Sequence, residues 1–231
     1  MGTNVLGNFI TQTRGLGDTR IGGIIRLLSR GGHQHEPATR TALLNVGLSL
    51  PTGSIEAKDH ILTPMEMRPE VRVPYPMQLG SGTYDLFYGF TYSSVQGAYS
   101  RGFGWGVQVI NTTRLGENKA GYKLGNKVNA TMWGSYLFRK WISSSVRIAY
   151  EQVGKVEGMD AQIMAPVQTA NPEFLGGQRM DVALGVNLLG LNGFTKDMRL
   201  AAEFALPVYQ NLNGPQLETD YIFTLGVQYA F

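Results

Sequence analysis

The sequence predicts an all-β protein: an up-and-down antiparallel transmembrane β-barrel, formed as one domain over residues 1–231. Three observations lead to this prediction. Almost every extended segment alternates apolar residues with polar or small ones, which is the two-residue period of a β-strand. The chain contains 30 glycines, 11 tyrosines, 10 phenylalanines and 3 tryptophans, and only 16% of its residues are charged. No segment has the composition or the period of an amphipathic helix.

Nine segments carry the alternation, and most approach the 9–11 residues of a tilted transmembrane strand. They cover residues 17–30, 41–50, 84–93, 102–109, 128–139, 146–151, 179–188, 198–209 and 219–231. Short turns are predicted at 96–100, 139–142 and 191–196, and longer loops at 52–80, 117–126, 157–178 and 211–218. Short turns on one rim and long loops on the other are typical of outer-membrane barrels.

The composition of the two strand faces separates a membrane barrel from a soluble β-sandwich or a lipocalin-like barrel. One face is apolar and almost free of charge, whereas the other carries Gly, Ala, Ser, Thr and Asn with isolated charges. We therefore expect the apolar face to contact lipid and the other face to line a crowded, wet lumen. Aromatic residues at strand ends are expected to form the interfacial girdles: Tyr84, Tyr92, Tyr136, Phe138, Tyr221, Tyr229 and Phe231.

The strand number predicts further strands upstream of this chain. Single-chain bacterial barrels normally have an even number of strands. Residues 3–13 alternate poorly and offer only a weak tenth strand, so we expect about nine or ten strands here and more in the full-length protein. The first 15 residues do not form a signal-peptide pattern, and no run of 18 apolar residues predicts a transmembrane helix. The expectation is that an N-terminal part is missing.

Several chemistries are disfavoured by composition. The chain has no cysteine, which excludes disulfides, thiolate metal sites and a cysteine nucleophile. The net charge is +3 without a basic run, so no nucleic-acid partner is expected. Glycines 102, 104 and 106 lie within a predicted strand, where they thin the lumen wall and do not cradle a phosphate.

The candidate metal and catalytic residues lie in predicted turns and loops, where polar residues are ordinary. No cofactor, bound metal or enzymatic activity is therefore expected. His33 and His35 offer two imidazoles in a predicted turn, where solvated polar residues are ordinary. His60 with Ser54 and Asp59 resembles a hydrolytic set by composition alone. The Met65-Glu66-Met67 segment could bind a soft metal, but a packing or constriction role in the longest loop is favoured.

Charged residues on the predicted lumen face are the candidate site. They are expected to set solute selectivity, or else to pair and hold the interior together. Two contacts, Arg179–Asp181 and Arg199–Glu203, are predicted to form a ladder between adjacent strands. The full set is Arg20, Arg26, Asp85, Arg147, Glu151, Arg179, Asp181, Arg199, Glu203 and Asp220.

Five segments and the chain end carry a resemblance to a known family. The end, Tyr229-Ala230-Phe231, resembles the assembly signal of bacterial outer-membrane barrels. The segments GLGDTRIG, LSLPTGSI, YPMQLGSGTYDL, RLGENKAGYKLG and LPVYQNLNGPQLETDY resemble the outer-membrane "transporter" family named after the MetA pathway of phenol degradation. The resemblance implies a barrel in a Gram-negative outer membrane, with outer-membrane lipid, lipopolysaccharide and the barrel-assembly machinery as partners.

The function expected from these features is passive uptake of small solutes. The family resemblance suggests hydrophobic or aromatic compounds, and the loops at 52–80 and 157–178 are expected to narrow the lumen. The alternative is a structural or binding barrel with a plugged, non-conducting lumen. An outer-membrane enzyme is disfavoured because no histidine lies on a predicted strand.

Overall fold

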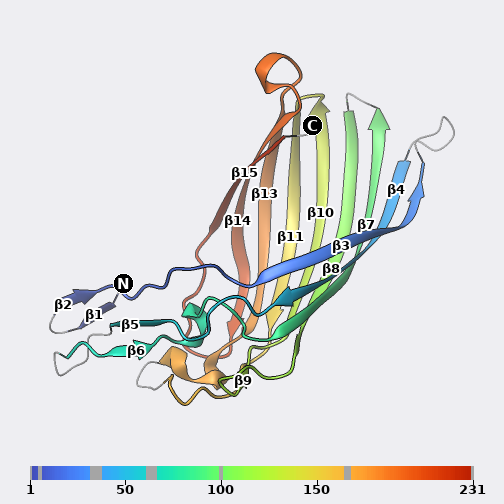
Figure 1. Cartoon of the computed structure of the whole chain (residues 1–231). Helices are drawn as coiled ribbons and strands as arrows, with labels where there is room; N and C mark the ends of the chain where they lie inside the picture. The colour runs from blue at the N-terminus through green and yellow to red at the C-terminus, as the bar shows by residue number, and fades with distance from the viewer. Residues whose placement is uncertain are drawn as a thin grey trace.

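The computed structural model describes residues 2–4, 7–31, 38–60, 67–98, 101–163 and 168–229, with only the backbone described for residues 2–4, 7–9, 98 and 101. Its main feature is one antiparallel sheet of nine strands in chain order (Figure 1). These strands are β3 (Thr19–Arg30), β4 (Ala38–Leu50), β7 (Tyr84–Ala98), β8 (Arg101–Leu115), β10 (Lys127–Arg139), β11 (Ile142–Val153), β13 (Gly177–Leu189), β14 (Met198–Leu212) and β15 (Ile222–Tyr229). All nine predicted strands are confirmed.

The remaining strands are short and lie outside this sheet. Each is paired only with one other: β1 (Gly2–Asn4) with β2 (Gly7–Phe9), β5 (Lys58–His60) with β6 (Glu70–Arg72), and β9 (Tyr122–Lys123) with β12 (Glu157–Gly158). The predicted tenth strand at residues 3–13 is wrong, because its described part forms the separate β1–β2 hairpin. The poor alternation of this segment leaves it no apolar face to place on the sheet.

Helical structure in the described residues is limited to single 3-10 turns. These are η1 (Tyr75–Met77), η2 (Gln168–Ala170), η3 (Pro172–Phe174) and η4 (Gly193–Thr195). None of these turns, nor any other helix in the described residues, is long and apolar enough to span a membrane.

Turns and loops separate to the two ends of the sheet as predicted (Figure 1). At one end, β10 and β11 are joined by two residues, 140–141, and β13 and β14 by residues 190–197. At the other end lie the connections 51–83, 116–126, 154–176 and 213–221, together with residues 10–18 before β3. All the elements outside the main sheet, except η4, belong to this second end.

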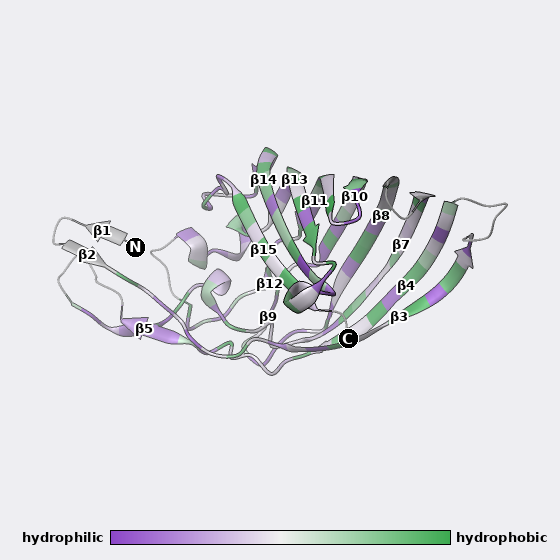
Figure 2. Ribbon diagram, turned by 90° about the horizontal axis from the view of Figure 1, so that it is seen from above, coloured by the Kyte–Doolittle hydropathy of each residue, from purple (hydrophilic) through white to green (hydrophobic). Residues whose placement is uncertain are grey.

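The two faces of the sheet differ as the alternation predicted, and Figure 2 shows hydrophobic and hydrophilic residues following one another along the strands. One face, which we call the apolar face, presents exposed large side chains on every strand, among them Leu184 at 64% and Leu225 at 62% exposure. Small or polar residues lie on the opposite, polar face, where Ala183, Ala205 and Asp181 are buried. Cross-strand pairs such as Leu184 with Phe204 keep the register that separates the two faces.

Wall glycines on the polar face lie beneath aromatic rings of neighbouring strands. Gly47 pairs with Phe87, and a Cβ atom added to Gly47 would lie 2.1 Å from the Phe87 ring. Gly106 pairs with Trp133 in the same way, with a separation of 2.3 Å. Only a residue without a side chain lets a ring lie this close to the neighbouring backbone.

Pro207 interrupts the alternation of β14 at a bulge. The pairing between β13 and β14 shifts between Met180 and Asp181, and Pro207 lies opposite Asp181. The neighbouring strand β15 pairs with β14 only up to Ala205, so the missing N–H of Pro207 faces no further partner strand. A proline is tolerated within a sheet at such a position.

The main sheet is open in the described part of the chain. Strands β3 and β15 lie at opposite ends of the row of strands, and no pairing connects them (Figure 2). The all-β, up-and-down antiparallel arrangement is therefore confirmed, whereas closure into a barrel stays a prediction.

Candidate functional site

The long loops pack together into a small unit at one end of the sheet, which we call the loop cap. It is formed by residues 51–60, 67–83, 116–126, 154–163 and 168–176. Its buried centre joins all but the first of these segments: Tyr75, Tyr122, Val156, Ile163, Ala170 and Leu175, with Ala120 and Leu124 against it. This cluster of buried apolar side chains lies in the loops, where burial of apolar surface holds the segments of the cap together.

A buried ion pair ties distant loops together in the cap. Arg72 Nη1 lies 2.6 Å from Asp160 Oδ2, and their side chains are 7% and 3% exposed. The backbone N–H of Asp160 donates to the Tyr75 hydroxyl at 3.0 Å. Both charges are partnered, as burial requires, and the pair fixes loop 51–83 against loop 154–176.

Two tyrosine rings form the centre of the cap. Tyr75 and Tyr122 pack edge to face, with ring centroids 4.8 Å apart and an interplanar angle of 75°. Burial raises the pKa of Tyr122 to about 12 and also raises the pKa of Tyr75, because a phenolate would lose its hydration there. The Tyr122 hydroxyl is buried without a hydrogen-bond partner in the described structure.

A row of polar residues crosses four strands beside the cap. Successive cross-strand pairs align Arg20 of β3 with Ser49 of β4, Asp85 of β7 and Arg114 of β8. Asp85 is fully buried and accepts hydrogen bonds from Arg114 and Thr83, and its Oδ2 lies 3.1 Å from the Ser81 hydroxyl oxygen. The sequence predicted Asp85 on this face, but its partner Arg114 was missed.

Asp18 extends this polar network from the segment before β3. Its Oδ1 accepts from the Gly53 backbone at 2.9 Å, and its Oδ2 accepts from the Ser81 backbone and hydroxyl at 2.7 and 2.8 Å. Asp18 therefore holds the start of β3 against loop 51–83.

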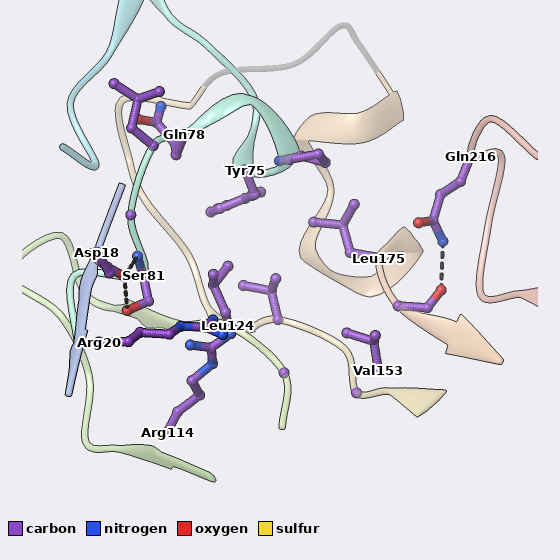
Figure 3. Close-up of a pocket in the computed structure, with 17 residues that line it drawn as sticks. Asp18, Arg20, Tyr75, Gln78, Ser81, Arg114, Leu124, Val153, Leu175 and Gln216 are labelled. Carbon is purple, nitrogen blue, oxygen red and sulfur yellow. Dashed lines mark hydrogen bonds between the residues drawn. The ribbon is translucent and has the colours of Figure 1, made fainter. Parts of the chain in front are cut away.

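A cavity of about 540 Å³ lies between the cap and the polar face of the sheet. Arg20, Arg114 and Val153 contribute from the strands, and Tyr75 and Leu175 from the cap (Figure 3). Figure 3 shows Arg20 and Arg114 on one side of the cavity and Leu175 and Val153 on the other. One side of the cavity thus carries two guanidinium groups together with Asp18, and the other side is apolar.

Further along the polar face, charged residues form separate pairs. Arg147 Nε donates to Glu203 Oε2 at 3.0 Å, and Lys127 Nζ lies 2.5 Å from Glu151 Oε2. Arg179 Nε lies 3.2 Å from Asp181 Oδ2, so these two residues pair within β13 and do not form the predicted ladder to β14.

The predicted Arg199–Glu203 contact is wrong. Arg199 instead donates to Asn187 Oδ1, at 3.1 Å from Nε and 2.6 Å from Nη2. Glu203 pairs with Arg147 two strands away because Gly185, opposite Glu203, has no side chain between them.

Two other predicted site residues stand apart from these pairs. Asp220 precedes β15, which begins at Ile222, so its predicted place on the strand is wrong. Arg26 remains on the polar face of β3, opposite Leu43, just before a bulge. Of the predicted assembly signal, Tyr229 ends β15 and is 59% exposed, whereas Phe231 lies outside the described residues.

The candidate metal and hydrolytic sites considered from the sequence do not form in the described parts of the chain. His33, His35, Met65 and Glu66 lie outside these parts, and no group of three potential metal ligands occurs within them. The His60 ring contacts the carbonyl of Arg68 at 3.1 Å, and Ser54 accepts from the Glu56 backbone, so neither contacts the other.

Comparison with known proteins adds no relative. No family model matches the sequence, and no curated protein matches it significantly. The resemblance to the phenol-pathway transporter family therefore stays a prediction.

Proposed function

We propose that the nine-stranded sheet is the wall of a bacterial outer-membrane β-barrel that lets small solutes diffuse through its lumen. The observation that carries this proposal is the exposed apolar face. Its side chains between Tyr84 and Tyr92 on β7, and between Val128 and Phe138 on β10, include no charged residue. A soluble monomer rarely exposes such a continuous apolar surface, whereas lipid would cover it at no cost.

Aromatic residues near the strand ends support a membrane-spanning width. Tyr221 directly precedes β15 and Tyr229 is its last residue; their side chains are 63% and 59% exposed. Eight residues at about 3.4 Å each, tilted by about 40°, span about 20 Å along the membrane normal. This approaches the apolar band of about 25 Å found in outer-membrane barrels.

The polar face then lines the lumen. Several of its charges are paired, among them Arg147 with Glu203 and Lys127 with Glu151, which is how ionised groups are kept in a narrow, partly dry passage. The same pairs would favour or retard ions and polar solutes according to charge. In the usual orientation of such barrels, short turns face the periplasm and long loops face outside, so the loop cap lies at the outer mouth.

Closure of the barrel is part of the proposal. Strands β3 and β15 are separated by eight antiparallel steps and therefore run in the same direction. Direct closure would join them as one parallel pair, whereas one additional strand between them would close the sheet with antiparallel pairs only. Either closure would satisfy the edge N–H and C=O groups that lipid cannot.

A second candidate function is a binding barrel whose lumen is plugged. The observation that favours it is the loop cap itself, which has its own packed centre and lies against the polar face of the wall. In this alternative the protein would insert into the membrane in the same way but would not conduct.

Insertion and conduction test the two candidates in turn. The protein would be refolded in detergent, and boiled and unboiled samples compared on a gel. A mobility shift supports a closed membrane barrel, and a water-soluble protein without a shift would refute it. Conductance in a planar bilayer then separates a channel from a plugged barrel.

A matched pair of variants tests whether the cap gates this conductance. Asp160→Ala removes the buried partner of Arg72 and should loosen the cap, raising conductance or its frequency of opening. Glu157→Ala removes an exposed partner of Lys123 in the same loop and should leave conductance unchanged. Equal conductance in both variants and the wild type would show that the cap does not restrict the passage.

A further inference from the structure

We propose that the cavity under the loop cap binds a small amphipathic carboxylate, with the carboxylate at Arg20 and Arg114 and the apolar body against the cap. This inference rests on the proposed function and deepens it by naming a class of solute. It follows from the hydrogen-bonding groups left open at the cavity and from the chemistry of its opposite side.

Unused donors gather on one side of the cavity. Arg114 Nε is buried and has no hydrogen-bond partner, although Nη1 of the same side chain pairs with Asp85. The Arg20 guanidinium forms no hydrogen bond or ion pair with any described residue. Both side chains line the same cavity (Figure 3). A buried N–H without an acceptor is costly, so an acceptor supplied by a ligand would be stabilised there.

The neighbouring carboxylates are already engaged by other groups of the protein. Asp18 accepts from the backbone N–H groups of Gly53 and Ser81, and Asp85 accepts from Arg114 and Thr83. The Ser81 hydroxyl lies within hydrogen-bond distance of both carboxylates, 2.8 Å from Asp18 Oδ2 and 3.1 Å from Asp85 Oδ2, and donates its one hydrogen to either. The unpartnered polar groups of the row are the Arg20 guanidinium, Arg114 Nε and the buried hydroxyl of Ser49. A carboxylate matches a guanidinium donor fork in geometry and charge.

The other side of the cavity suits an apolar body. Val153 and Leu175 lie on this side, and Leu124, Val156 and the ring of Tyr75 also line the cavity (Figure 3). A volume of about 540 Å³ lies within the range of small-molecule sites. Because donors and apolar side chains occupy opposite sides, a ligand with a charged head and an apolar tail would satisfy both.

Binding would be measured on the full chain in nanodiscs of zwitterionic lipid, by calorimetry with 4-phenylbutanoate. Three further probes separate the contributions: the amide 4-phenylbutanamide keeps an acceptor without charge, 4-phenylbutylammonium reverses the charge, and inorganic phosphate lacks the apolar body. The expected order has 4-phenylbutanoate tightest, the amide weaker, and the cation and phosphate not binding at the cavity.

Matched arginine variants locate the site. Arg20→Gln should weaken 4-phenylbutanoate binding about 10- to 100-fold, as expected for loss of a charge-assisted contact, and should leave amide binding nearly unchanged. Arg26→Gln lies on the same face of the same strand but away from the cavity, and should bind as the wild type does. Because Arg20 is exposed and unpaired, its replacement should not impair folding, which the gel-shift assay checks.

The outcomes that would overturn the inference are distinct from failure of the channel. Equal affinity for the acid and the amide, equal effects of Arg20→Gln and Arg26→Gln, or absence of 4-phenylbutanoate binding would each refute it. A conducting barrel that does not bind 4-phenylbutanoate refutes the ligand class alone. Binding without conductance refutes passive diffusion and leaves the ligand site standing.

Discussion

Leu225→Arg places a charge at the centre of the apolar face. Leu225 lies midway along the exposed side of β15, four residues from Tyr221 and four from Tyr229, and is 62% exposed. At about 3.4 Å per residue and a tilt of about 40°, it lies about 10 Å from each flanking tyrosine along the membrane normal. If the apolar face contacts lipid, this position is close to the midplane.

The expected cost follows from that depth. An arginine at the midplane of a transmembrane barrel destabilises the fold by about 2–4 kcal/mol, or about 30- to 700-fold in the folding equilibrium. The assay is reversible denaturant unfolding from phospholipid vesicles, followed by the band shift between folded and unfolded protein. Leu225→Arg should lower the unfolding midpoint and leave the slope unchanged.

Thr224→Arg is the matched control. Thr224 is the adjacent residue on the polar face and pairs with Glu203 of β14, so the same new charge would meet water and a carboxylate. Its unfolding free energy should change by less than about 1 kcal/mol. The lipid-facing assignment would be refuted if the two variants lost equal stability, or if Leu225→Arg cost nothing.

Three other outcomes concern the cap and the lumen. Tyr122→Phe removes a buried hydroxyl that has no hydrogen-bond partner, so the stability of the cap should stay unchanged or rise slightly. Tyr75→Phe removes the hydroxyl that accepts from the Asp160 backbone N–H and should lower the stability of the cap by about 1 kcal/mol. Protease protection of the loops measures both effects. Burial raises the pKa of Tyr122 to about 12 from 10.0, so the folded cap holds the phenol proton more tightly than the unfolded chain does. Cap stability should therefore be intact below pH 10 and fall between pH 10 and 12, with phenolate absorbance as the readout. A fall in stability already at neutral pH would contradict this cause. Glu203→Gln leaves Arg147 without its carboxylate and should shift reversal potentials toward anion selectivity, while unchanged potentials would place the pair outside the conducting path.

The strands and their faces were predictable because they depend on a local period. Alternation alone places Leu184 and Leu225 on one face and Asp181 on the other, since a strand reverses side at each residue. The short turn at residues 140–141 and the long loops follow from where the alternation stops. Bulges such as the one opposite Pro207 could only be located once the pairing was known.

The charge pairs were only partly predictable because they depend on register and on the size of intervening residues. Arg179 and Asp181 are two residues apart on one strand, so their contact is local. Glu203 reaches Arg147 only because Gly185 and Ala183 on the intervening strand have no side chain or a small one. The alternation within a single strand does not predict such a contact across two strands.

The loop cap was not predictable from any local pattern. Its ion pair joins Arg72 to Asp160, which are 88 residues apart in the chain. The only available signal was chemical: an arginine beside Val71, Val73 and Tyr75 in an otherwise apolar stretch implies a buried partner. Which carboxylate supplies it depends on the folding of a second loop.

The glycines beneath Phe87 and Trp133 have a consequence for the cross-section of the proposed passage. A ring lying over a glycine removes only about its own thickness, near 3.5 Å, from the free radius. A methyl group at Gly47 or Gly106 would push the neighbouring aromatic ring away from the sheet. The long dimension of the ring, and not its thickness, would then project into the proposed passage. The free radius at these two heights is therefore determined by the absence of a side chain on one strand as much as by the aromatic residue on the next.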